Sequence, residues 1–363
     1  MSGVRHLYVH LPFCAHRCGY CDFVTLVGRR GEHASYVDAL LAELEREAAL
    51  LNDPLETVFL GGGTPTFTEP AELGRLLRAL PEAAEVTVEA NPETVTPALA
   101  ALLRETGVNR VSLGVQSFEP RLLAVLERRA GPEDVRRAFY HLRDASFDNI
   151  SLDLLYGVPG QTAADLRRDL EQALALAPEH LSCYELEAKQ GTRFTHAHGA
   201  ELERQAEAME GYLEMVVETL VGAGYRWYET ANFCREGRQA RHNLAYWKGR
   251  DYVGLGIGAV STVGETRWRN TPKLRQYVSA LAAGEAPPRE VEPLDEGVRQ
   301  RERLMLGLRL DEPVALGAVG DAFDADALGR LEAVGLAERR AGGLVLTERG
   351  RFLGGGVTAE LTA

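Results

Sequence analysis

The sequence predicts an α/β protein built around a barrel or partial barrel of parallel strands and followed by a smaller α+β region. Short apolar runs rich in β-branched and aromatic residues alternate with longer amphipathic segments over the first 225 residues. Parallel strands need such helical crossovers. Polar and glycine-rich residues follow the ends of these runs, where barrels of this class bind ligands. An open doubly wound sheet binds ligands at the same edge, so that alternative stays open on the pattern alone.

Six strands are expected in the barrel, at residues 6–11, 56–63, 85–91, 110–117, 149–157 and 180–187. Between them, apolar residues recur at helical spacing, most clearly in SYVDALLAELEREAALL at residues 35–51. Further helices are expected at residues 69–80, 97–106, 132–145, 162–177 and 200–223.

The C-terminal region is expected to begin after a linker marked by Pro287 and Pro288. Its sequence predicts three helices, a hairpin around Gly342 and Gly343, and a mobile Gly-rich tail after Phe352. The helices are expected at residues 296–309, 314–324 and 325–335. Three helices and a hairpin together resemble a winged-helix unit.

A winged-helix unit is either a DNA-binding domain or a small structural or docking module. Between Asp321 and Phe352 the chain has six acidic and five basic residues, so this unit has no basic face for phosphates. The net charge of −13 supports the same conclusion, because nonspecific nucleic-acid binding needs an excess of Lys and Arg. We therefore expect a docking or structural module and no nucleic-acid partner.

The length and cysteine content indicate a protein of the reducing cytoplasm. A chain of 363 residues allows two or three domains with a sizeable core. No apolar run is long enough to predict a transmembrane segment, and MSGVRHLYVHLPF lacks the layout of a signal peptide. The five cysteines, three of them within eight positions, do not resemble a secreted disulfide framework. We therefore expect a cytoplasmic location and reduced thiols.

The stretch CAHRCGYCDF contains Cys14, Cys18 and Cys21. Three thiolates at this spacing can bind zinc, form a disulfide or hold an iron–sulfur cluster. Structural zinc takes four ligands, commonly from two CxxC pairs, and this sequence offers no second pair. A [4Fe–4S] cluster held by three cysteines leaves one iron open for a chelating ligand. The alternative is three apolar cysteines on one helical stripe, but Pro12 and Gly19 favour a loop.

CxxxCxxC with an aromatic residue before the last cysteine, here Tyr20, resembles the signature of the radical S-adenosylmethionine (SAM) superfamily. The resemblance implies a partial (β/α)6 barrel with one [4Fe–4S] cluster on Cys14, Cys18 and Cys21. It also implies that the amino and carboxylate groups of SAM chelate the open iron.

Polar residues follow several predicted strands and form a ring at the expected barrel mouth. The glycines of GGGTP (61–65) let backbone groups approach a ligand closely. Arg128, expected in the helix after the fourth strand, can pair with a carboxylate, and Asp153 or Gln116 can accept hydrogen bonds from ribose hydroxyls. Each residue alone is equally an exposed charge or a satisfied core group.

The spacing of these residues resembles the SAM site of the oxygen-independent coproporphyrinogen dehydrogenase family. This resemblance implies a SAM site formed by Tyr8, Tyr20, Phe23, Gly62, Gly63, Thr64, Glu89, Gln116, Arg128 and Asp153. The similarity extends over GTRF (191–194), YVGLGIGA (252–259) and RWRN (267–270).

That family contains an enzyme, which oxidatively decarboxylates coproporphyrinogen III with SAM-derived radicals, and HemW-type haem chaperones, which pass haem to acceptor proteins. Three features favour the chaperones. The enzyme resembles CxxxCxxCxC, whereas Phe23 stands two positions after Cys21 here. The enzyme has a long N-terminal extension, whereas thirteen residues precede Cys14 here. RHNLAYW (241–247) matches the chaperone motif HNxxYW.

The motif implies a haem site formed by His242, Asn243, Tyr246 and Trp247. Neutral imidazole is a common ligand of haem iron, and an indole can lie against the macrocycle. On one helix, Arg238, His242 and Tyr246 share a stripe, and our hypothesis is that Arg238 or Arg241 pairs with haem propionates. Without the resemblance, the motif is equally a packed aromatic helix.

Two other positions bear on haem ligation. The GxGxGA segment is commonly followed by His in this family, whereas Val260 stands there here, which leaves the second axial ligand open. Cys234 is expected to be a loop thiol, with thiolate ligation of haem as the alternative. Cys183 alternates with apolar residues and is expected in the core.

These observations predict a radical SAM barrel over residues 1–225, a connecting region with the haem motif over 226–290 and a winged-helix-like domain over 291–363. The expected function is a haem chaperone that carries a SAM-ligated [4Fe–4S] cluster, and the alternative is a radical SAM enzyme acting on a porphyrinogen. The resemblance implies haem, an electron donor and acceptor haemoproteins as partners, respiratory membrane proteins among the acceptors.

Overall fold

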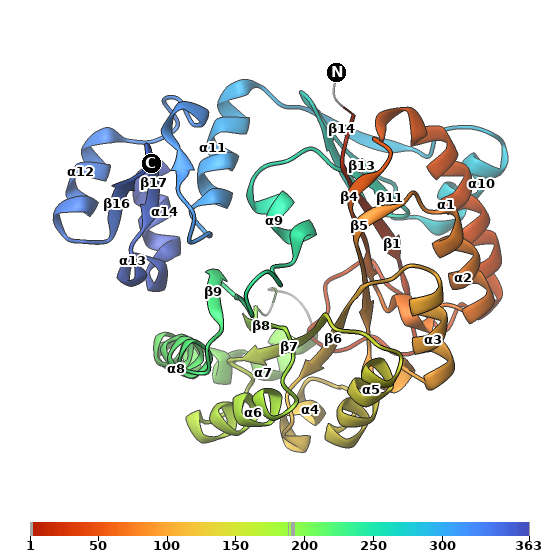
Figure 1. The fold of residues 1–363 in the computed structure, drawn as a ribbon, viewed down its shortest axis with the longest axis horizontal. Coiled ribbons are helices and arrows are strands. Elements are labelled where there is room, and N and C mark those ends of the chain that lie inside the picture. Colours follow the sequence, from red (N-terminus) through yellow and green to blue (C-terminus); the bar gives the residue numbers. More distant parts are fainter. Residues whose placement is uncertain (1–2, 188, 190–192, 363) are drawn as a thin grey trace.

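A computed structural model describes residues 3–187, 189 and 193–362 (Figure 1). Its core is a nine-stranded sheet with strand order β11-β1-β4-β5-β6-β7-β8-β10-β9. The six expected barrel strands are confirmed and run parallel to one another. They are β1 (His6–Leu11), β4 (Leu55–Gly62), β5 (Ala83–Ala90), β6 (Arg110–Gln116), β7 (Ile150–Tyr156) and β8 (His180–Glu185).

Helices follow these strands and cover the outside of the sheet (Figure 1). The expected ones are α1 (His33–Glu47), α2 (Pro70–Ala79), α3 (Pro97–Glu105), α5 (Pro132–Asp144) and α6 (Ala163–Ala175), and the short α4 (Pro120–Val125) was not expected. The hydroxyls of Thr96 and Thr162 cap α3 and α6. The single helix expected over 200–223 is wrong: a 3-10 turn separates α7 (Arg193–Gln205) from α8 (Met209–Gly222).

The segment expected to connect the two domains adds strands to both edges of the barrel sheet. β11 (Val253–Leu255) pairs with β1, while β9 (Arg226–Glu229) and β10 (Asn232–Cys234) extend the sheet beyond β8. Cys234 therefore lies buried in a strand, which corrects the expected loop thiol. Helix α9 (Arg241–Trp247) carries the HNLAYW motif and packs against β4 (Figure 1). Gly191 and Thr192 of GTRF lie outside the described residues.

A second sheet contains β12 (Val260–Val263), β13 (Thr266–Asn270) and β14 (Arg289–Pro293), and α10 (Leu274–Ala282) precedes β14. The Pro287–Pro288 pair therefore leads into a paired strand, so the expected linker is wrong. The buried Glu43 fixes this layer to α1, because its carboxylate accepts hydrogen bonds from the Tyr277 hydroxyl (2.5 Å) and Asn270 Nδ2 (2.7 Å).

The C-terminal unit has its own apolar core and lies beside the barrel, with α9 between them (Figure 1). It contains α11 (Glu296–Gly307), β15 (Val314–Ala315), α12 (Ala325–Ala333), β16 (Ala337–Arg340), β17 (Gly343–Leu346), α13 (Glu348–Phe352) and α14 (Gly354–Thr362). The expected helix over 314–324 is wrong, since Val314 pairs with Leu344 in a three-stranded sheet. The tail forms α14 and buries Val357 and Leu361. None of the helices in the described residues is long and apolar enough to span a bilayer.

Candidate functional site

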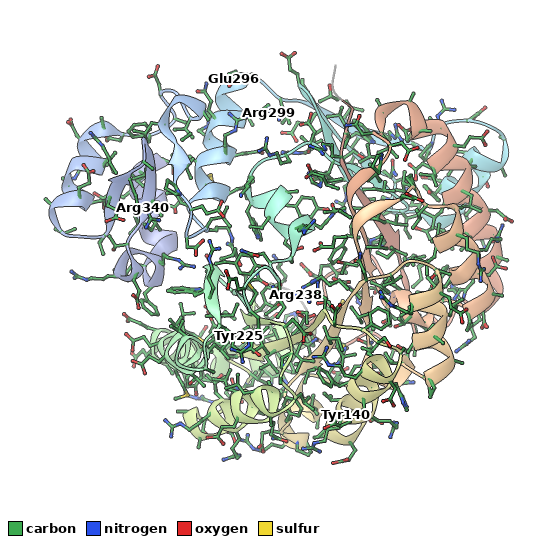
Figure 2. The ribbon with its side chains drawn as sticks, in the orientation of Figure 1. Tyr140, Tyr225, Arg238, Glu296, Arg299 and Arg340 are labelled. Atoms are coloured by element: carbon green, nitrogen blue, oxygen red, sulfur yellow. The ribbon has the colours of Figure 1, made fainter. Side chains whose placement is uncertain are left out.

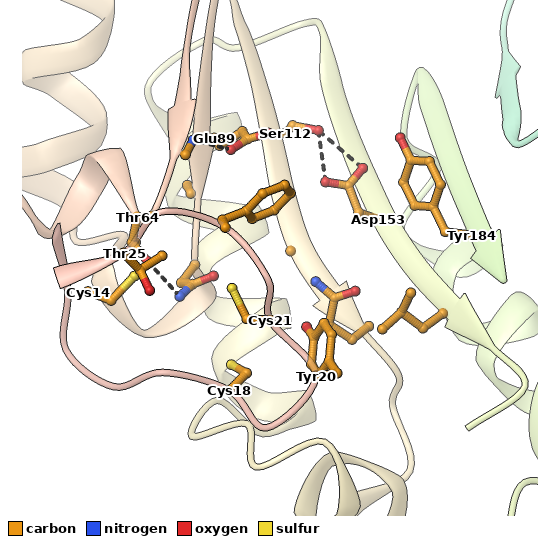
Figure 3. A pocket seen from close by; sticks show the side chains of 18 of the residues that line it. Cys14, Cys18, Tyr20, Cys21, Thr25, Thr64, Glu89, Ser112, Asp153 and Tyr184 are labelled. Carbon is orange, nitrogen blue, oxygen red and sulfur yellow. Dashed lines mark hydrogen bonds between the residues drawn. The ribbon is translucent and has the colours of Figure 1, made fainter. Parts of the chain in front are cut away.

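A cavity of about 390 Å³ lies inside the barrel, and the three clustered cysteines line it (Figure 3). Nine of the ten residues expected to bind SAM line the same cavity, namely Tyr20, Phe23, Gly62, Gly63, Thr64, Glu89, Gln116, Arg128 and Asp153. They come from separate strands and loops of the barrel. The fold therefore gathers the cysteine loop and the polar ring at one place, as the parallel strands require.

The cysteines lie on a loop that a two-stranded parallel pair closes. Phe13 pairs with Leu26 and Cys14 with Val27, in β2 (Phe13–Cys14) and β3 (Leu26–Val27). Between these strands the chain is irregular, so the helical-stripe alternative for the cysteines is wrong. All five cysteines are free thiols.

Two of the three cluster thiols have a defined polar neighbour. Cys14 is buried with its Sγ 3.5 Å from Thr64 Oγ1, while Cys18 Sγ accepts from Arg128 Nη1 at 3.7 Å. Burial raises the pKa of Cys14 to about 11, and it also raises the pKa of Cys21. Thiolate formation on this loop therefore needs the positive charge of a metal to offset burial.

The donor set fits a multi-iron cluster better than a single ion. Among residues 3–187, 189 and 193–362, no three His, Cys, Asp or Glu side chains are grouped closely enough to hold one metal ion. In a [4Fe–4S] cluster the cysteines bind separate irons, so three soft ligands spread along one cavity wall match its needs.

The glycines of GGGTP are needed by packing against the cysteine loop. A Cβ at Gly63 would lie 2.6 Å from the backbone carbonyl of Pro12 and 3.0 Å from Cys14 Sγ. Gly62 has a φ of 112°, and a Cβ there would lie 2.5 Å from the His10 ring. Close contact between protein segments thus explains why glycine is needed at these two positions, in addition to the approach of a ligand that the sequence suggested.

Two partly buried carboxylates, Glu89 and Asp153, line the cavity (Figure 3). Burial and the neighbouring Asp153 charge raise the pKa of Glu89 to about 7, although the Gly62 amide donates to Glu89 Oε2 at 3.2 Å. Burial also raises the pKa of Asp153, which accepts from the Ser112 hydroxyl at 2.9 Å. The pair therefore carries less than two negative charges near neutral pH.

Gln116 ends β6 in a strained conformation. Its φ is 68°, and the register between β6 and β7 shifts at this point. The buried Asp169 holds the following turn, since its carboxylate accepts from Ser117 Oγ (2.7 Å) and from the Phe118 amide (2.6 Å). Such strain persists only where surrounding contacts fix it, and here it directs Gln116 to the cavity.

Arg128 lies just after α4 and its following turn, which corrects its expected place in a helix. Its Nη2 donates to the Gly114 carbonyl (2.6 Å) and to Asn91 Oδ1 (3.0 Å), while Nε has no partner. The guanidinium therefore points along the cavity toward Cys18 with one donor unused.

Tyr8 is the candidate that lies outside the barrel cavity. Its hydroxyl lies 3.0 Å from His10 Nδ1, and its ring stacks on Phe59 at 6.2 Å between centroids. Tyr8 instead lines a neighbouring cavity of about 290 Å³ together with Tyr246 and Val260. Val260, which replaces the histidine common in the family, therefore lies beside α9, the helix that carries the HNLAYW motif.

His242 is held inside the barrel wall. Its side chain is 1% exposed, Nδ1 lies 2.7 Å from Thr57 Oγ1, and Nε2 lies 2.9 Å from the Tyr246 hydroxyl. Burial lowers the pKa of His242 to about 3, so the ring is a neutral imidazole. The first amides of α9, from Arg241 and His242, donate to the two Glu85 carboxylate oxygens at 3.1 Å each.

The other motif residues lie on different sides of α9. Asn243 lines the barrel cavity, whereas Trp247 lines an outer groove of about 300 Å³ and packs under Arg309, 4.4 Å from its ring centroid. The common stripe with Arg238 is wrong, because α9 begins at Arg241. Arg238, which is labelled in Figure 2, instead pairs with Asp148 at 3.1 Å.

Several cavity residues were missed in the sequence, namely Asn91, Arg110, Ser112, Ser182 and Tyr184. Successive side chains of a strand alternate between faces, so residues four and six positions before Gln116 could have been expected in the barrel. That alternation identifies Ser112 and Arg110.

Two family models match this chain. Residues 8–173 match the family model of the Radical SAM superfamily, and residues 294–353 match that of the HemN C-terminal domain. A solved structure, "Coproporphyrinogen III oxidase (HemN) from Escherichia coli", has a TM-score of 0.82 and 24% identity, and the match covers 99% of this chain and 91% of that chain. At this identity the likeness shows the fold alone.

Curated relatives named "Heme chaperone HemW" are similar over nearly the whole chain. The protein of Mycobacterium tuberculosis is 37% identical over 98% of this chain and 94% of its own length. That of Bacillus subtilis is 33% identical, with 97% of each chain covered. That of Escherichia coli is 38% identical over 70% of this chain and 68% of its own. The chain therefore belongs to the HemW family of heme chaperones within the radical SAM superfamily.

Proposed function

We propose that this protein binds haem and delivers it to acceptor haemoproteins, while its barrel holds a [4Fe–4S] cluster and SAM. The observation that carries the proposal is the place of α9. This helix bears the HNLAYW motif, and its Asn243 lines the same cavity as the cysteines. The relatives named as heme chaperones are similar over nearly the whole chain, which includes both the cysteine loop and α9.

The cavity residues divide the binding of cluster and SAM among them. Cys14, Cys18 and Cys21 would ligate three irons of the cluster. Arg128, whose Nη1 lies beside Cys18 and whose Nε has no partner, would pair with the SAM carboxylate, and Gln116 and Asp153 would accept from its ribose. When bound, the cluster supplies an electron for reduction of the SAM sulfonium; the chain's own part is to hold SAM in place.

Haem is the cargo in this proposal, with His242 as its iron ligand. The neutral ring has suitable donor chemistry, but the Tyr246 hydroxyl blocks its Nε2 and the ring is buried in this arrangement. Ligation therefore requires Tyr246 to release Nε2, and we propose that α9 shifts to allow it. Val260 in place of a histidine leaves the other face of the iron to a ligand from outside this segment.

The remaining parts serve partners. We propose that residues 1–225 form the radical SAM barrel and that 226–290 form a connecting region that contains the haem motif. Residues 291–363 would form a winged-helix-like docking module for acceptors, respiratory membrane proteins among them. An electron donor for the cluster is a further partner. The six acidic and five basic residues between Asp321 and Phe352 favour docking to protein over nucleic acid.

A transfer assay tests this function. Haem-loaded, cluster-reconstituted protein is mixed anaerobically with an apo-haemoprotein that has a distinct Soret band. The proposal predicts transfer faster than spontaneous haem release from albumin measured in parallel. No transfer, combined with coproporphyrinogen-dependent cleavage of SAM, would replace the chaperone with the radical enzyme.

A further inference from the structure

A buried arginine on the barrel floor has no role in the cluster or SAM site described above. Arg110 begins β6 and is 2% exposed. Residues two apart on a strand share a face, and Arg110, Ser112, Gly114 and Gln116 all line the barrel cavity. The Arg110 guanidinium therefore faces the interior of the barrel, at the end opposite to Gln116.

The Arg110 guanidinium acts on two cavity carboxylates through its charge, which opposes the rise in the pKa of Glu89 and of Asp153 that burial causes. In the described part of the chain it forms no ion pair or hydrogen bond, and its buried Nε is without any partner. Three interior carboxylates accept their hydrogen bonds from other groups: Glu85 from the α9 amides, Glu89 from the Gly62 amide, and Asp153 from Ser112 and Ser151. A buried guanidinium with unused donors is unfavourable, so this arrangement indicates a ligand that accepts hydrogen bonds from Arg110.

The position of Arg110 separates it from the expected SAM carboxylate. Six residues of extended strand, about 20 Å, lie between the backbones of Arg110 and Gln116. At the far end Arg128 contacts Cys18, which is where a SAM carboxylate on the cluster would lie. At the near end Asn243 of the motif helix lines the cavity, and the Arg110 charge contributes to the low pKa of His242. The guanidinium with unused donors is thus on the side of the haem motif.

We infer that Arg110 receives a carboxylate of the ligand carried at α9, which for haem is a propionate side chain. This inference rests on the proposed function and names the group that recognises the cargo. It replaces our hypothesis for Arg238 and Arg241, since Arg238 is paired with Asp148 and the side chain of Arg241 is exposed outside the cavity. A guanidinium forms two parallel hydrogen bonds to a carboxylate, which adds direction to the charge.

Mesoporphyrin IX tests the inference without iron, because it has two propionates and no metal to ligate. Its affinity and that of its dimethyl ester are measured by fluorescence for the reconstituted protein and for Arg110→Met and Arg110→Lys. We expect the diacid to bind about tenfold or more tightly than the diester, because a hydrogen bond to a charged group contributes a free energy of binding that corresponds to this ratio. The ratio should fall to near one in Arg110→Met and be partly kept in Arg110→Lys.

Matched controls exclude a general effect of charge. Arg238→Gln and Arg241→Gln remove arginines that lie beside α9 and do not line the cavity, and they should leave the diacid-to-diester ratio unchanged. Thermal unfolding of Arg110→Met should stay close to that of the wild type, because the guanidinium donates no direct hydrogen bond within the described residues. Earlier unfolding would indicate a structural partner and overturn the inference.

The outcomes separate this inference from the proposed function. Tight haem binding, with a diacid-to-diester affinity ratio that is the same in the wild type and in Arg110→Met, would overturn the inference and keep the chaperone. Mesoporphyrin binding that depends on Arg110, without haem binding, would keep the inference and overturn the chaperone. A loss of SAM affinity in Arg110→Met with an unchanged porphyrin ratio would assign the carboxylate to SAM and overturn the inference, as would binding of neither porphyrin.

Discussion

Replacing Gly63 by alanine tests whether the cysteine loop is seated by close packing. In the structure the added Cβ would lie 2.6 Å from the Pro12 carbonyl, and an ordinary contact of 3.4 Å needs a shift of about 0.8 Å. Both sides of the contact are backbone, because Gly63 and Thr64 donate to the Leu11 and Phe13 carbonyls. Overpacking of this kind costs about 1–3 kcal/mol.

The same clash displaces Cys14, so it should weaken cluster retention about 5- to 150-fold. Iron and sulfide content after anaerobic reconstitution, and the free energy of unfolding in urea, measure the two effects. The matched control is Gly211→Ala in the exposed face of α8, where a Cβ meets nothing within 4 Å. That change should stabilise the helix by about 0.5–1 kcal/mol. Full cluster content and unchanged stability in Gly63→Ala would refute the packing argument.

Three further perturbations have defined outcomes. Asp169→Asn should lower stability by about 1–3 kcal/mol in urea and weaken SAM binding in calorimetry, because it frees the strained turn of Gln116; unchanged SAM affinity would contradict this. SAM affinity should rise as pH increases through about 7, because the ionised form of Glu89 accepts a hydrogen bond from SAM and burial and Asp153 raise the pKa of Glu89 to about 7. This rise in affinity should be absent in Glu89→Gln. Because the folded pKa of Glu89 is raised, its contribution to stability falls as pH rises from its ordinary pKa to about 7. Thr57→Val should destabilise by about 1–3 kcal/mol in urea, since it leaves the buried Nδ1 of His242 unpaired; no loss would show that the ring relaxes.

The barrel and the cysteine site were predictable because their signals are local. Each strand is a short apolar run, and GGGTP, Glu89, Gln116 and Asp153 follow runs whose carboxyl ends must meet at one edge of a parallel sheet. The cysteine loop could be predicted as a loop because Pro12 and Gly19 disfavour a helix in this segment.

The parts that sequence reasoning missed depend on partners far away in the chain. Asp169 holds the Gln116 turn across 52 residues, and Glu85 holds α9 across 157. Val314 becomes a strand residue because β17 pairs with it, although its own segment has helical spacing. Arg238 precedes His242 at helical spacing, but helix α9 starts only at Arg241. The spacing of residues in the sequence does not determine such features, because contacts between distant parts of the chain override local preference.

The most direct test of haem carriage is an anaerobic haem titration of the cluster-reconstituted protein and of His242→Ala, followed by absorbance. The proposed function predicts saturable binding near equimolar haem in the wild type and a strong loss of affinity in the variant. It also predicts an imidazole-type ligand spectrum that the variant lacks. Saturable binding unaffected by the substitution would move the iron ligand away from His242, and no specific binding by the wild type would contradict haem carriage itself.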